Sequence, residues 1–420
     1  MGEGLRLPRP YSGCAPASAR ARFPSPITSS FPGNLLSGKR LNSSSQTIQG
    51  ISHSTDLAFM AEARALGRLG AGRTWTNPMV GAVVVKDGEV IASAYHQRLG
   101  EPHAECLAFA AAGDRARGAT LYVSLEPCAH QGRTPPCVEG ILTAGIARVV
   151  IPAPDPDARV SGLGIEMLRA RGVRVDVGCD AAAAILDNHG YYHNRLGVAR
   201  TVTLKMATSR DGKVSRAPGQ RDRVTGDAAQ LDTHRLRAVN DAIVIGAETA
   251  RIDRPRLDCR LLEAGVDREP ATVVFDTGLS LADDATWPEA GRDDTVVCGV
   301  SADAARECAL EKRGIRVVRN SARIVDALEK LGFARVLVEG GPRLMRSFIE
   351  AGTWDAFWHY EAKEEFGANG VSMGQVPVGT MIDELALDFD VRRRYVNATS
   401  WDRLIGGLKQ REDGNVHGDR

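Results

Sequence analysis

The sequence predicts a two-domain α/β protein, and three observations support this prediction. The 420-residue chain is longer than a single hydrophobic core usually serves. Apolar runs of strand length alternate with helical patterns over 52–190 and again over 198–409. A polar, glycine-containing stretch at 188–199 separates the two series, so we place the domain boundary there.

The first series begins with helical apolar spacing over 57–65. A β-branched run at 79–85 predicts a strand, and the Lys-Asp-Gly sequence at 86–88 predicts a turn after it. The remaining expected elements are a helix over 103–112, a strand at 119–125, a helix from about 137 and a strand at 147–151.

The second series contains six runs with the composition of buried strands. They lie near 201–206, 242–245, 271–275, 295–300, 316–318 and 335–338. Because strands alternate with helices in both series, we expect largely parallel or mixed sheets.

The two ends of the chain do not fit either domain. Residues 1–51 are rich in serine, and the first 50 hold five arginines and one lysine against a single acid, Glu3. This composition is typical of an organelle transit peptide, which would place the protein in a plastid. It also fits a disordered extension, or a start site placed too far upstream in a bacterial gene, which would leave the protein in the cytoplasm. Residues 410–420 are expected to be a polar tail.

Composition excludes several classes of function. The formal net charge is +1, so no whole-chain attraction to nucleic acid or to an anionic membrane is expected. No run of 18 apolar residues predicts a membrane-spanning helix. The eight cysteines are irregularly spaced, which indicates a reducing compartment in which a few thiols have a chemical role. We therefore expect a small-molecule partner, and the sequence leaves open whether the chain forms a homo-oligomer.

One histidine, one glutamate and two cysteines form the strongest motif of the first domain. His103 and Glu105 are followed by Cys128 and Cys137. One imidazole and two thiolates supply three ligands for Zn²⁺ and leave the fourth tetrahedral position open for water. The metal lowers the pKa of that water to ~7. Glu105 is then the predicted catalytic residue, because it can carry the water's proton to a leaving amine.

The order H-x-E followed by P-C is that of the zinc deaminases, although here eight residues separate the two cysteines. The segment 126–137, with its Gly-Arg-Thr-Pro-Pro sequence, resembles the deaminase domain of the bifunctional riboflavin-biosynthesis deaminase/reductases. The resemblance extends through 77–81, His96 and 155–156. It implies a cytidine-deaminase-like α/β/α domain over 52–190. A fourth protein ligand would close the metal site, so we interpret His130 as a loop residue near substrate.

Three blocks of the second series, at 204–213, 241–260 and 338–342, resemble the reductase domain of the same family. The resemblance implies a dihydrofolate-reductase-like α/β domain over 198–409 that uses NADPH. The implied substrate-binding residues are Lys205, Arg237, Asp253, Arg260 and Glu339. The implied cofactor-binding residues are Ala207, Thr249, Thr277, Gly341, Pro342, Arg343, Leu344, Met345 and Arg346.

The third block also has a physical rationale of its own. Gly340 and Gly341 directly follow a strand, so their backbone N–H groups can approach a diphosphate at the start of the next helix. No G-x-G-x-x-G sequence opens a strand–helix unit, so a Rossmann dinucleotide domain is not indicated.

The resemblance implies two successive reactions. The first is hydrolytic deamination of 2,5-diamino-6-ribosylamino-4(3H)-pyrimidinone 5′-phosphate, and the second is reduction of its ribosylamino group to ribitylamino by NADPH. Arg221, Arg223 and Arg256 depart from the reductase pattern, so a monofunctional deaminase with a scaffold-only second domain is the alternative. A zinc-binding regulatory or nucleic-acid module is disfavoured by the near-zero net charge and by Glu105 beside the metal motif.

Overall fold

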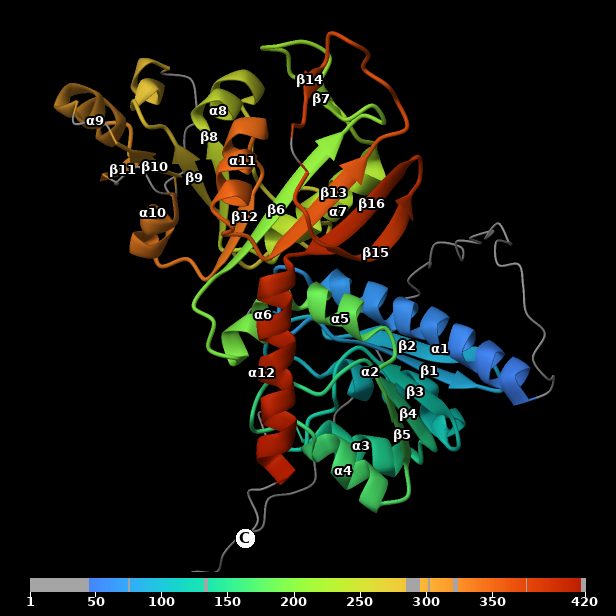
Figure 1. The fold of residues 1–420 in the computed structure, drawn as a ribbon. Coiled ribbons are helices and arrows are strands. Elements are labelled where there is room, and N and C mark those ends of the chain that lie inside the picture. The colour runs from blue at the N-terminus through green and yellow to red at the C-terminus, as the bar shows by residue number, and fades with distance from the viewer. Residues whose placement is uncertain are drawn as a thin grey trace, which may run out of the picture. The chain divides into compact units, whose positions relative to one another are not determined.

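The computed structural model describes residues 45–74, 76–131, 135–284, 295–300, 303–319, 324–374 and 376–416. Residues 49–420 form one structural unit, which contains two large sheets (Figure 1). The expectations for residues 1–44 lie outside the described residues.

The first sheet has five strands in the order β2-β1-β3-β4-β5. Its strands are β1 (Gly81–Lys86), β2 (Glu89–Tyr95), β3 (Thr120–Val123), β4 (Arg148–Ile151) and β5 (Arg174–Val177). Strand β1 pairs antiparallel with β2 and β3, whereas β3, β4 and β5 are mutually parallel. The helices of this region are α1 (Ser45–Gly67), α2 (Ala104–Ala112), α3 (Cys137–Ala144), α4 (Leu163–Ala170), α5 (Ala181–Asp187) and α6 (His189–Arg195).

Helices cover both faces of the five-stranded sheet, because successive side chains of a strand point to opposite faces. Ala82 and Val84 of β1 pack with apolar residues of α2, α3 and α4. Val83 and Val85 pack on the other face with Met60 and Ala63 of α1. This confirms the predicted α/β/α arrangement.

The second sheet has nine strands in the order β11-β10-β9-β8-β12-β6-β13-β16-β15. The first seven are parallel, and β16 and β15 extend the sheet antiparallel. The strands are β6 (Thr201–Thr208), β8 (Ala242–Gly246), β9 (Ala271–Phe275), β10 (Thr295–Gly299), β11 (Arg316–Arg319), β12 (Arg335–Val338), β13 (Ala356–Glu361), β15 (Thr380–Leu387) and β16 (Asp390–Val396). A separate two-stranded antiparallel sheet pairs β7 (Lys213–Ser215) with β14 (Val371–Ser372).

The nine-stranded sheet is also covered on both faces. Ile243 and Ile245 of β8 share a core with Leu236 of α7, whereas Val244 faces a core that includes Phe348 of α11. The helices are α7 (Asp227–Ala238), α8 (Ala247–Asp253), α9 (Ala304–Glu311), α10 (Ile324–Leu331), α11 (Pro342–Glu350) and α12 (Ala398–Val416). Mixed sheets with helices on both faces confirm the predicted fold class.

All nine strands expected from the sequence are present, but the sequence did not predict β2, β5, β7 or β13 to β16. Helix α1 begins at Ser45, inside the range expected to lack packed structure. Helix α6 occupies part of the expected boundary at 188–199. Helix α12 continues to Val416, although 410–420 was expected to be a tail.

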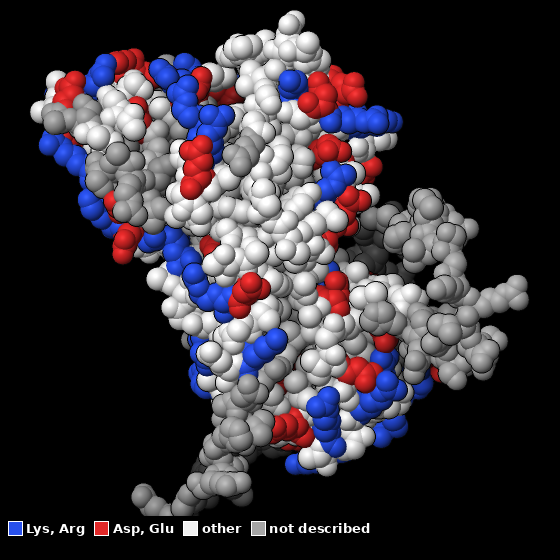
Figure 2. Space-filling view, viewed as in Figure 1, with Lys and Arg blue, Asp and Glu red and all other residues white. Residues whose placement is uncertain are grey.

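The C-terminal helix α12 contributes to the region around the first sheet. Its Leu404 is fully buried together with Ile185 of α5 and Tyr192 of α6. None of the described helices is both long and apolar enough to cross a membrane. On the face shown in Figure 2, basic and acidic side chains are interspersed over the described surface.

Candidate functional site

The histidine and the two cysteines predicted as zinc ligands lie together at the start of two helices. His103 is the N-cap residue of α2, Cys137 opens α3, and Cys128 lies on the loop that follows β3. One nitrogen of His103 and the two Sγ atoms all lie within 4.8 Å of one another. His103 Nδ1 is 3.2 Å from Cys137 Sγ and 3.6 Å from Cys128 Sγ. Among the described residues, no other group of this kind could hold a metal ion.

This donor set fits zinc. One imidazole nitrogen and two sulfurs at these separations can surround an ion with bonds of about 2.0–2.3 Å. The amino-terminal ends of α2 and α3 bring partial positive charge to the site, which favours the thiolate forms. The backbone N–H of Cys137 also donates to Cys128 Sγ at 3.3 Å. His130 lines the same pocket but does not belong to the donor set.

Electrostatics of the side chains agree with a thiolate-containing site. A hydrogen bond with Cys137 lowers the pKa of Cys128 to about 4, and His103 contributes in the same direction. The same Cys128 raises the pKa of His103 to about 9. Contact with Cys106 and Cys128 raises the pKa of Cys137.

Glu105 lies on the first turn of α2, two residues after His103, and its side chain is buried. Burial raises the pKa of its carboxyl group, and the charge of Cys128 acts in the same direction. A carboxyl group with a raised pKa can both accept and return a proton near neutral pH. The position therefore suits the proton-carrying role predicted for Glu105.

A cavity of about 390 Å³, here called the deaminase pocket, opens beside these residues. Its lining includes His103, Glu105, Cys128, His130 and Asp155. Further lining side chains are Asn77, His96, Leu99, Glu101, Glu126, Tyr191 and Arg195. A volume of this size can hold a small heterocyclic ligand.

Two polar side chains that line the deaminase pocket, His96 and Tyr191, are held by hydrogen bonds. His96 lies 3.2 Å through Nδ1 from the carbonyl oxygen of Pro102 and 3.5 Å through Nε2 from the amide of Asn77. Burial lowers the pKa of His96, so the neutral ring donates from Nδ1 and accepts at Nε2. Across the pocket, the Tyr191 hydroxyl donates to Asp155 Oδ1 at 2.9 Å.

A buried glutamate that the sequence analysis did not single out anchors the cysteine loop. Glu126 accepts hydrogen bonds from the backbone N–H groups of Asp155, Gly162, Gly164 and Ile165, at 2.9–3.3 Å. These donors lie some 30 to 40 residues further along the chain, so no local motif indicated the contact. Because Cys128 follows Glu126 by two residues, this network fixes one wall of the metal site.

The residues predicted for the reductase site gather at the carboxyl ends of the parallel strands of the second sheet. Glu339, Gly340 and Gly341 follow β12, Thr277 follows β9, and Thr249 and Asp253 lie on α8, which follows β8. Ala207 lies near the end of β6. Open α/β sheets bind their ligands at this edge.

This region contains a largely buried ion pair. Arg237 of α7 donates from Nε and Nη2 to the two carboxylate oxygens of Glu339 at 2.7 and 2.9 Å. Its Nη1 donates to the carbonyl oxygen of Asp258 at 3.2 Å. Lys205 lies close by on β6, with Nζ 5.4 Å from the centre of the Tyr360 ring. Burial lowers the pKa of Lys205, whereas Glu339 opposes this shift.

The remaining substrate candidates are more exposed. Arg260 pairs with Asp258, and its side chain is 45% exposed. Asp253 closes α8, and burial raises the pKa of its carboxyl group. Arg237 was also expected to bind substrate, but three of its N–H groups already bind Glu339 and the carbonyl oxygen of Asp258. Arg260 is therefore the less committed of the two guanidinium groups.

The cofactor candidates centre on the start of α11. Gly341 is its N-cap residue, Pro342 is its first residue, and the Gly341 N–H donates to Thr249 Oγ1 at 3.2 Å. Leu344 and Met345 are buried in the core, so only their backbone groups can face a cofactor. Arg343 and Arg346 are exposed on the same helix.

The three arginines that depart from the reductase pattern are exposed. Arg223 pairs with Asp227, and Arg256 pairs with Asp258. Arg221 acts electrostatically on Asp253, whose pKa it lowers against the raising effect of burial. None of the three disrupts the Arg237–Glu339 pair.

Comparisons with known proteins agree with both halves of the chain. Residues 53–153 match the family described as cytidine and deoxycytidylate deaminase zinc-binding region, and residues 200–387 match the RibD C-terminal domain. The chain is 34% identical over 355 residues to the riboflavin biosynthesis protein RibD of Aquifex aeolicus, covering 83% of this chain and 97% of that protein. It is 32% identical over 345 residues to RibD of Escherichia coli, covering 77% and 91%.

Solved structures give the same result. A structure from Thermotoga maritima, described as a diaminohydroxyphosphoribosylaminopyrimidine deaminase/5-amino-6-(5-phosphoribosylamino)uracil reductase, has a TM-score of 0.60 and 30% identity, covering 83% of this chain and all of that one. RibD of Acinetobacter baumannii has a TM-score of 0.58 and 30% identity, covering 82% and 99%.

The fold and the two sites thus define a zinc-binding deaminase domain joined to a reductase domain on one polypeptide. This is the organisation of the enzymes that catalyse two steps of riboflavin biosynthesis. The chain belongs to the RibD family of bifunctional deaminase/reductases.

Proposed function

We propose that the deaminase domain releases ammonia from 2,5-diamino-6-ribosylamino-4(3H)-pyrimidinone 5′-phosphate. We further propose that the reductase domain uses NADPH to convert the ribosylamino group of the product to ribitylamino. The observation that carries the first half is the His103, Cys128 and Cys137 cluster beside buried Glu105. The substrate class follows from the Thermotoga maritima relative, which is described as a diaminohydroxyphosphoribosylaminopyrimidine deaminase and 5-amino-6-(5-phosphoribosylamino)uracil reductase.

In the deaminase pocket, His103, Cys128 and Cys137 would hold Zn²⁺. The bound ion would supply a water molecule of lowered pKa as the nucleophile. Glu105 accepts a proton from the attacking water at its carboxylate and delivers it to the departing amine, so that ammonia leaves. His96, whose ring lies 5.5 Å from that of His103, and Asn77 offer polar contacts in the same pocket.

In the reductase domain, the Arg237–Glu339 pair would orient the sugar chain and base of the substrate. Arg260 would bind the phosphate with its exposed guanidinium group. NADPH would supply the hydride, held by the N–H groups at the start of α11 and by Thr249 and Thr277. Lys205 would hold a proton at Nζ beside the reacting carbon, where burial lowers its pKa.

We place the enzyme in a reducing compartment, the bacterial cytoplasm, because the metal site depends on free thiols. Its partners would be small phosphorylated pyrimidines, with no requirement for nucleic acid or a membrane. A homo-oligomer is compatible with this function, which needs only one chain for each site.

A coupled assay on one preparation tests both halves of the proposal. Ammonia release from the diaminopyrimidinone phosphate, NADPH oxidation on the deaminated product and zinc content would be measured together. We expect one zinc per chain and both activities. A preparation with zinc that releases no ammonia contradicts the first half. Ammonia release without substrate-dependent NADPH oxidation would favour the alternative, a deaminase with a scaffold-only second domain.

The Cys137→Ser variant tests the independence of the two sites. We expect it to lose zinc and ammonia release together, because Cys137 supplies one of three metal donors. NADPH oxidation on supplied deaminated product should remain, because the reductase residues lie in a separate core. Cys308→Ser, which changes an exposed thiol on α9, is the matched control and should keep both activities. Loss of NADPH oxidation in Cys137→Ser would show that the sites are not independent.

A further inference from the structure

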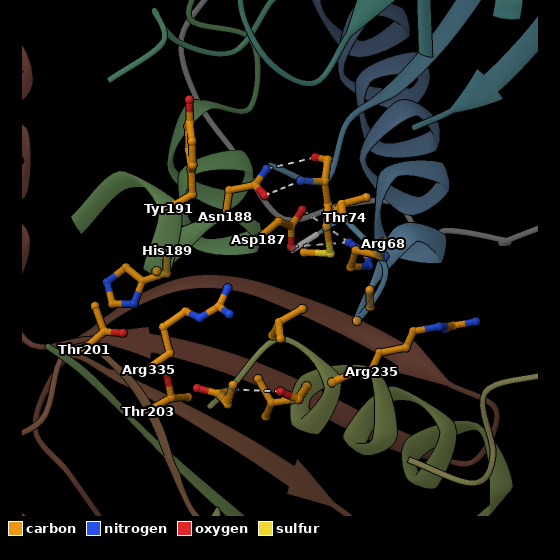
Figure 3. A pocket seen from close by; sticks show the side chains of 18 of the residues that line it. Arg68, Thr74, Asp187, Asn188, His189, Tyr191, Thr201, Thr203, Arg235 and Arg335 are labelled. Atoms are coloured by element: carbon orange, nitrogen blue, oxygen red, sulfur yellow. Dashed lines mark hydrogen bonds and ion pairs between the residues drawn. The ribbon is translucent and has the colours of Figure 1, made fainter. Parts of the chain in front are cut away.

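A second cavity, of about 380 Å³, is used by neither proposed reaction. We call it the Arg235 cavity, and Figure 3 shows its lining. One wall comes from residues 68–79 and the α5–α6 junction, and the other from β6, α7 and β12. Because Thr201, Thr203 and Arg335 lie at the amino end of β6 and β12, the cavity is at the opposite end of the strands from the reductase residues.

Most of the surface that the Arg235 cavity exposes is apolar, although many of its lining residues carry polar or charged side chains. The apolar groups include Met79, Leu99, Leu186, Leu236 and Trp358. A cavity of this size with a largely apolar surface and polar groups around it is typical of a small-molecule site.

Four polar side chains of the lining have no hydrogen-bond or ion-pair partner within the described part of the chain. They are Thr74, His189, Thr203 and Arg235, two from each wall of the cavity. His189 is buried, and its Nδ1 is solvent-inaccessible without a partner. Burial lowers the pKa of His189, so its ring is neutral. Buried polar groups without partners are rare in native proteins unless a water or ligand satisfies them.

Charge in the Arg235 cavity favours an anion. Its carboxylates are already compensated: Asp187 pairs with Arg64 at 2.8 Å, Asp232 with Arg392 at 2.9 Å, and Asp267 with Arg98 at 2.5 Å. Arg235 lines the cavity from α7 and has no carboxylate partner among the described residues; in Figure 3 its side chain extends away from the other labelled side chains, at the edge of the view. A guanidinium group without a counter-ion is suited to a phosphate, sulfonate or carboxylate.

The Arg235 cavity also shares a wall with the deaminase pocket. Asn77, Leu99 and Tyr191 line both. Asn188 ties this wall together, since its side-chain amide binds the N–H and the carbonyl of Met79 at 2.8 and 3.0 Å (Figure 3). In the deaminase pocket the same wall presents Asn77 to His96 and Tyr191 to Asp155.

We propose that the Arg235 cavity is a second small-molecule site, which binds a ring compound carrying one anionic group, and that its occupation alters substrate binding in the deaminase pocket. The apolar walls accept the ring, Arg235 binds the anionic group, and the threonine hydroxyls and His189 satisfy polar atoms of the ring. The effect on the deaminase passes through Asn77, Leu99 and Tyr191, and this second part rests on the proposed function.

The test uses 8-anilinonaphthalene-1-sulfonate, an aromatic monoanion whose fluorescence rises in apolar surroundings, with the full-length protein. We expect saturable binding of one molecule per chain that persists with saturating NADPH. Arg235→Gln should weaken binding about tenfold or more, because a charge-assisted hydrogen bond is lost. Arg171→Gln, which changes an exposed arginine after α4, is the matched control and should bind as the unchanged protein does.

A second variant fills the cavity. Thr203→Phe adds a ring to the wall, and we expect it to abolish binding while circular dichroism shows a native spectrum; if it does not fold, Arg235→Gln alone decides. Absence of saturable binding, displacement by NADPH, or equal affinity in Arg235→Gln and the unchanged protein would overturn the site.

The coupling is measured as the KM for ammonia release with and without the saturating dye. We expect at least a twofold change, absent from Arg235→Gln. An unchanged KM overturns the coupling, whereas a protein that releases no ammonia at all contradicts the proposed function and leaves the dye titration to decide on the cavity.

Discussion

Individual carboxyl groups in the deaminase pocket differ in what surrounds them. Glu105 is buried next to the metal donors, and Glu126 is buried among four backbone N–H groups. Asp155 accepts a hydrogen bond from the Tyr191 hydroxyl. Burial raises the pKa of all three. Only Glu105 lies beside the His103, Cys128 and Cys137 cluster, so only Glu105 is placed to move protons during deamination.

Replacing Glu105 with glutamine removes the proton carrier and keeps the side-chain size. We expect ammonia release to fall by about 10²–10⁴-fold, the usual contribution of general acid–base catalysis, with zinc content unchanged. Turnover and metal content would be measured on the same sample. Glu166→Gln, on the exposed surface of α4, should leave both unchanged. Turnover of Glu105→Gln within tenfold of the control would exclude this role.

Asp155 gives the protein a pH-dependent stability. Burial raises the pKa of its carboxyl group from an ordinary 3.8 to about 7. Folding thus favours the protonated form of Asp155. The stabilisation that this form contributes to the free energy of unfolding is fully present below pH 4 and is lost as the pH rises through 7. A rise in pKa from 3.8 to about 7 corresponds to about 4 kcal/mol of unfolding free energy, since each pKa unit is worth about 1.4 kcal/mol.

Asp155→Asn keeps an oxygen acceptor for Tyr191 but cannot ionise. We therefore expect its free energy of unfolding to exceed that of the unchanged protein by a few kcal/mol at pH 8 and by much less at pH 5. Urea unfolding at both pH values measures the difference. Asp114→Asn, at an exposed position, serves as the control. A gap that is the same at both pH values would contradict the raised pKa.

At the scale of elements, the metal site depends on how closely α4 approaches the loop after β3. A Cβ atom on Gly164 of α4 would lie 2.2 Å from the carbonyl oxygen of Pro127, the residue before Cys128. Real Cβ atoms do not approach backbone this closely, so a side chain at this position must displace the loop. Glycine is therefore required here by close packing and not by its backbone dihedral angles.

Gly164→Ala should accordingly lower zinc affinity and destabilise the protein by about 1–3 kcal/mol, the usual cost of overpacking. The measurements are metal content after dialysis against a chelator and urea unfolding. Gly140→Ala is the matched control, because its nearest contacts, on Phe109, are at 3.8 Å and it lies within α3. Alanine should be neutral or stabilising there. Equal zinc retention in the two variants would contradict the close approach.

The sequence predicted elements well where a strand is buried on both faces, and poorly at the margins of the sheets. The central strands β8 and β12 are continuous apolar runs, which periodicity detects readily. Strand β2, at an edge, is largely exposed or half-buried and alternates without a clear apolar side. Strand β16 contains three successive arginines, a pattern typical of an exposed segment, yet Arg392 and Arg394 are almost completely buried.

At the scale of the whole molecule, these arginines belong to a buried ion network that joins distant segments. Arg394 pairs with Asp187 at 2.6 Å and also with Asp383 of β15. Asp187 in turn pairs with Arg64 of α1 at 2.8 Å. Burial alone would raise the pKa of Asp187, but Arg64, Arg394 and Arg68 lower it far below its usual value.

Removing the charge of Asp187 tests the network. Asp187→Asn leaves buried guanidinium groups undercompensated, and we expect a loss of about 3–5 kcal/mol in the free energy of unfolding. The expected cost is high because Arg394 is completely buried and Asp187 is 5% exposed. Urea unfolding gives the value, and Asp402→Asn on the exposed side of α12 is the control. A loss below about 1 kcal/mol would show that the network contributes little.

The candidate sites also differ in how far the sequence alone predicts them. The metal donors and Glu105 were predictable because they lie within 35 residues in a spacing that zinc chemistry demands. The reductase residues required a resemblance, because Arg237 and Glu339 are separated by 102 positions. The Glu126 anchor and the Arg235 cavity had no signal in the sequence, since their parts come from segments that only folding brings together.

The sequence by itself determined the two α/β series, the zinc motif and the membership of a deaminase/reductase family. Its near-neutral net charge also indicated that ligand binding must depend on a few placed groups. Only the tertiary structure decided which of the many arginines are structural and which are available to ligands. The physical reason is that a guanidinium group acquires its role from the carboxylate that pairs with it. Arg394 is buried against Asp187 and Asp383, whereas Arg235 lines a cavity and pairs with no carboxylate among the described residues.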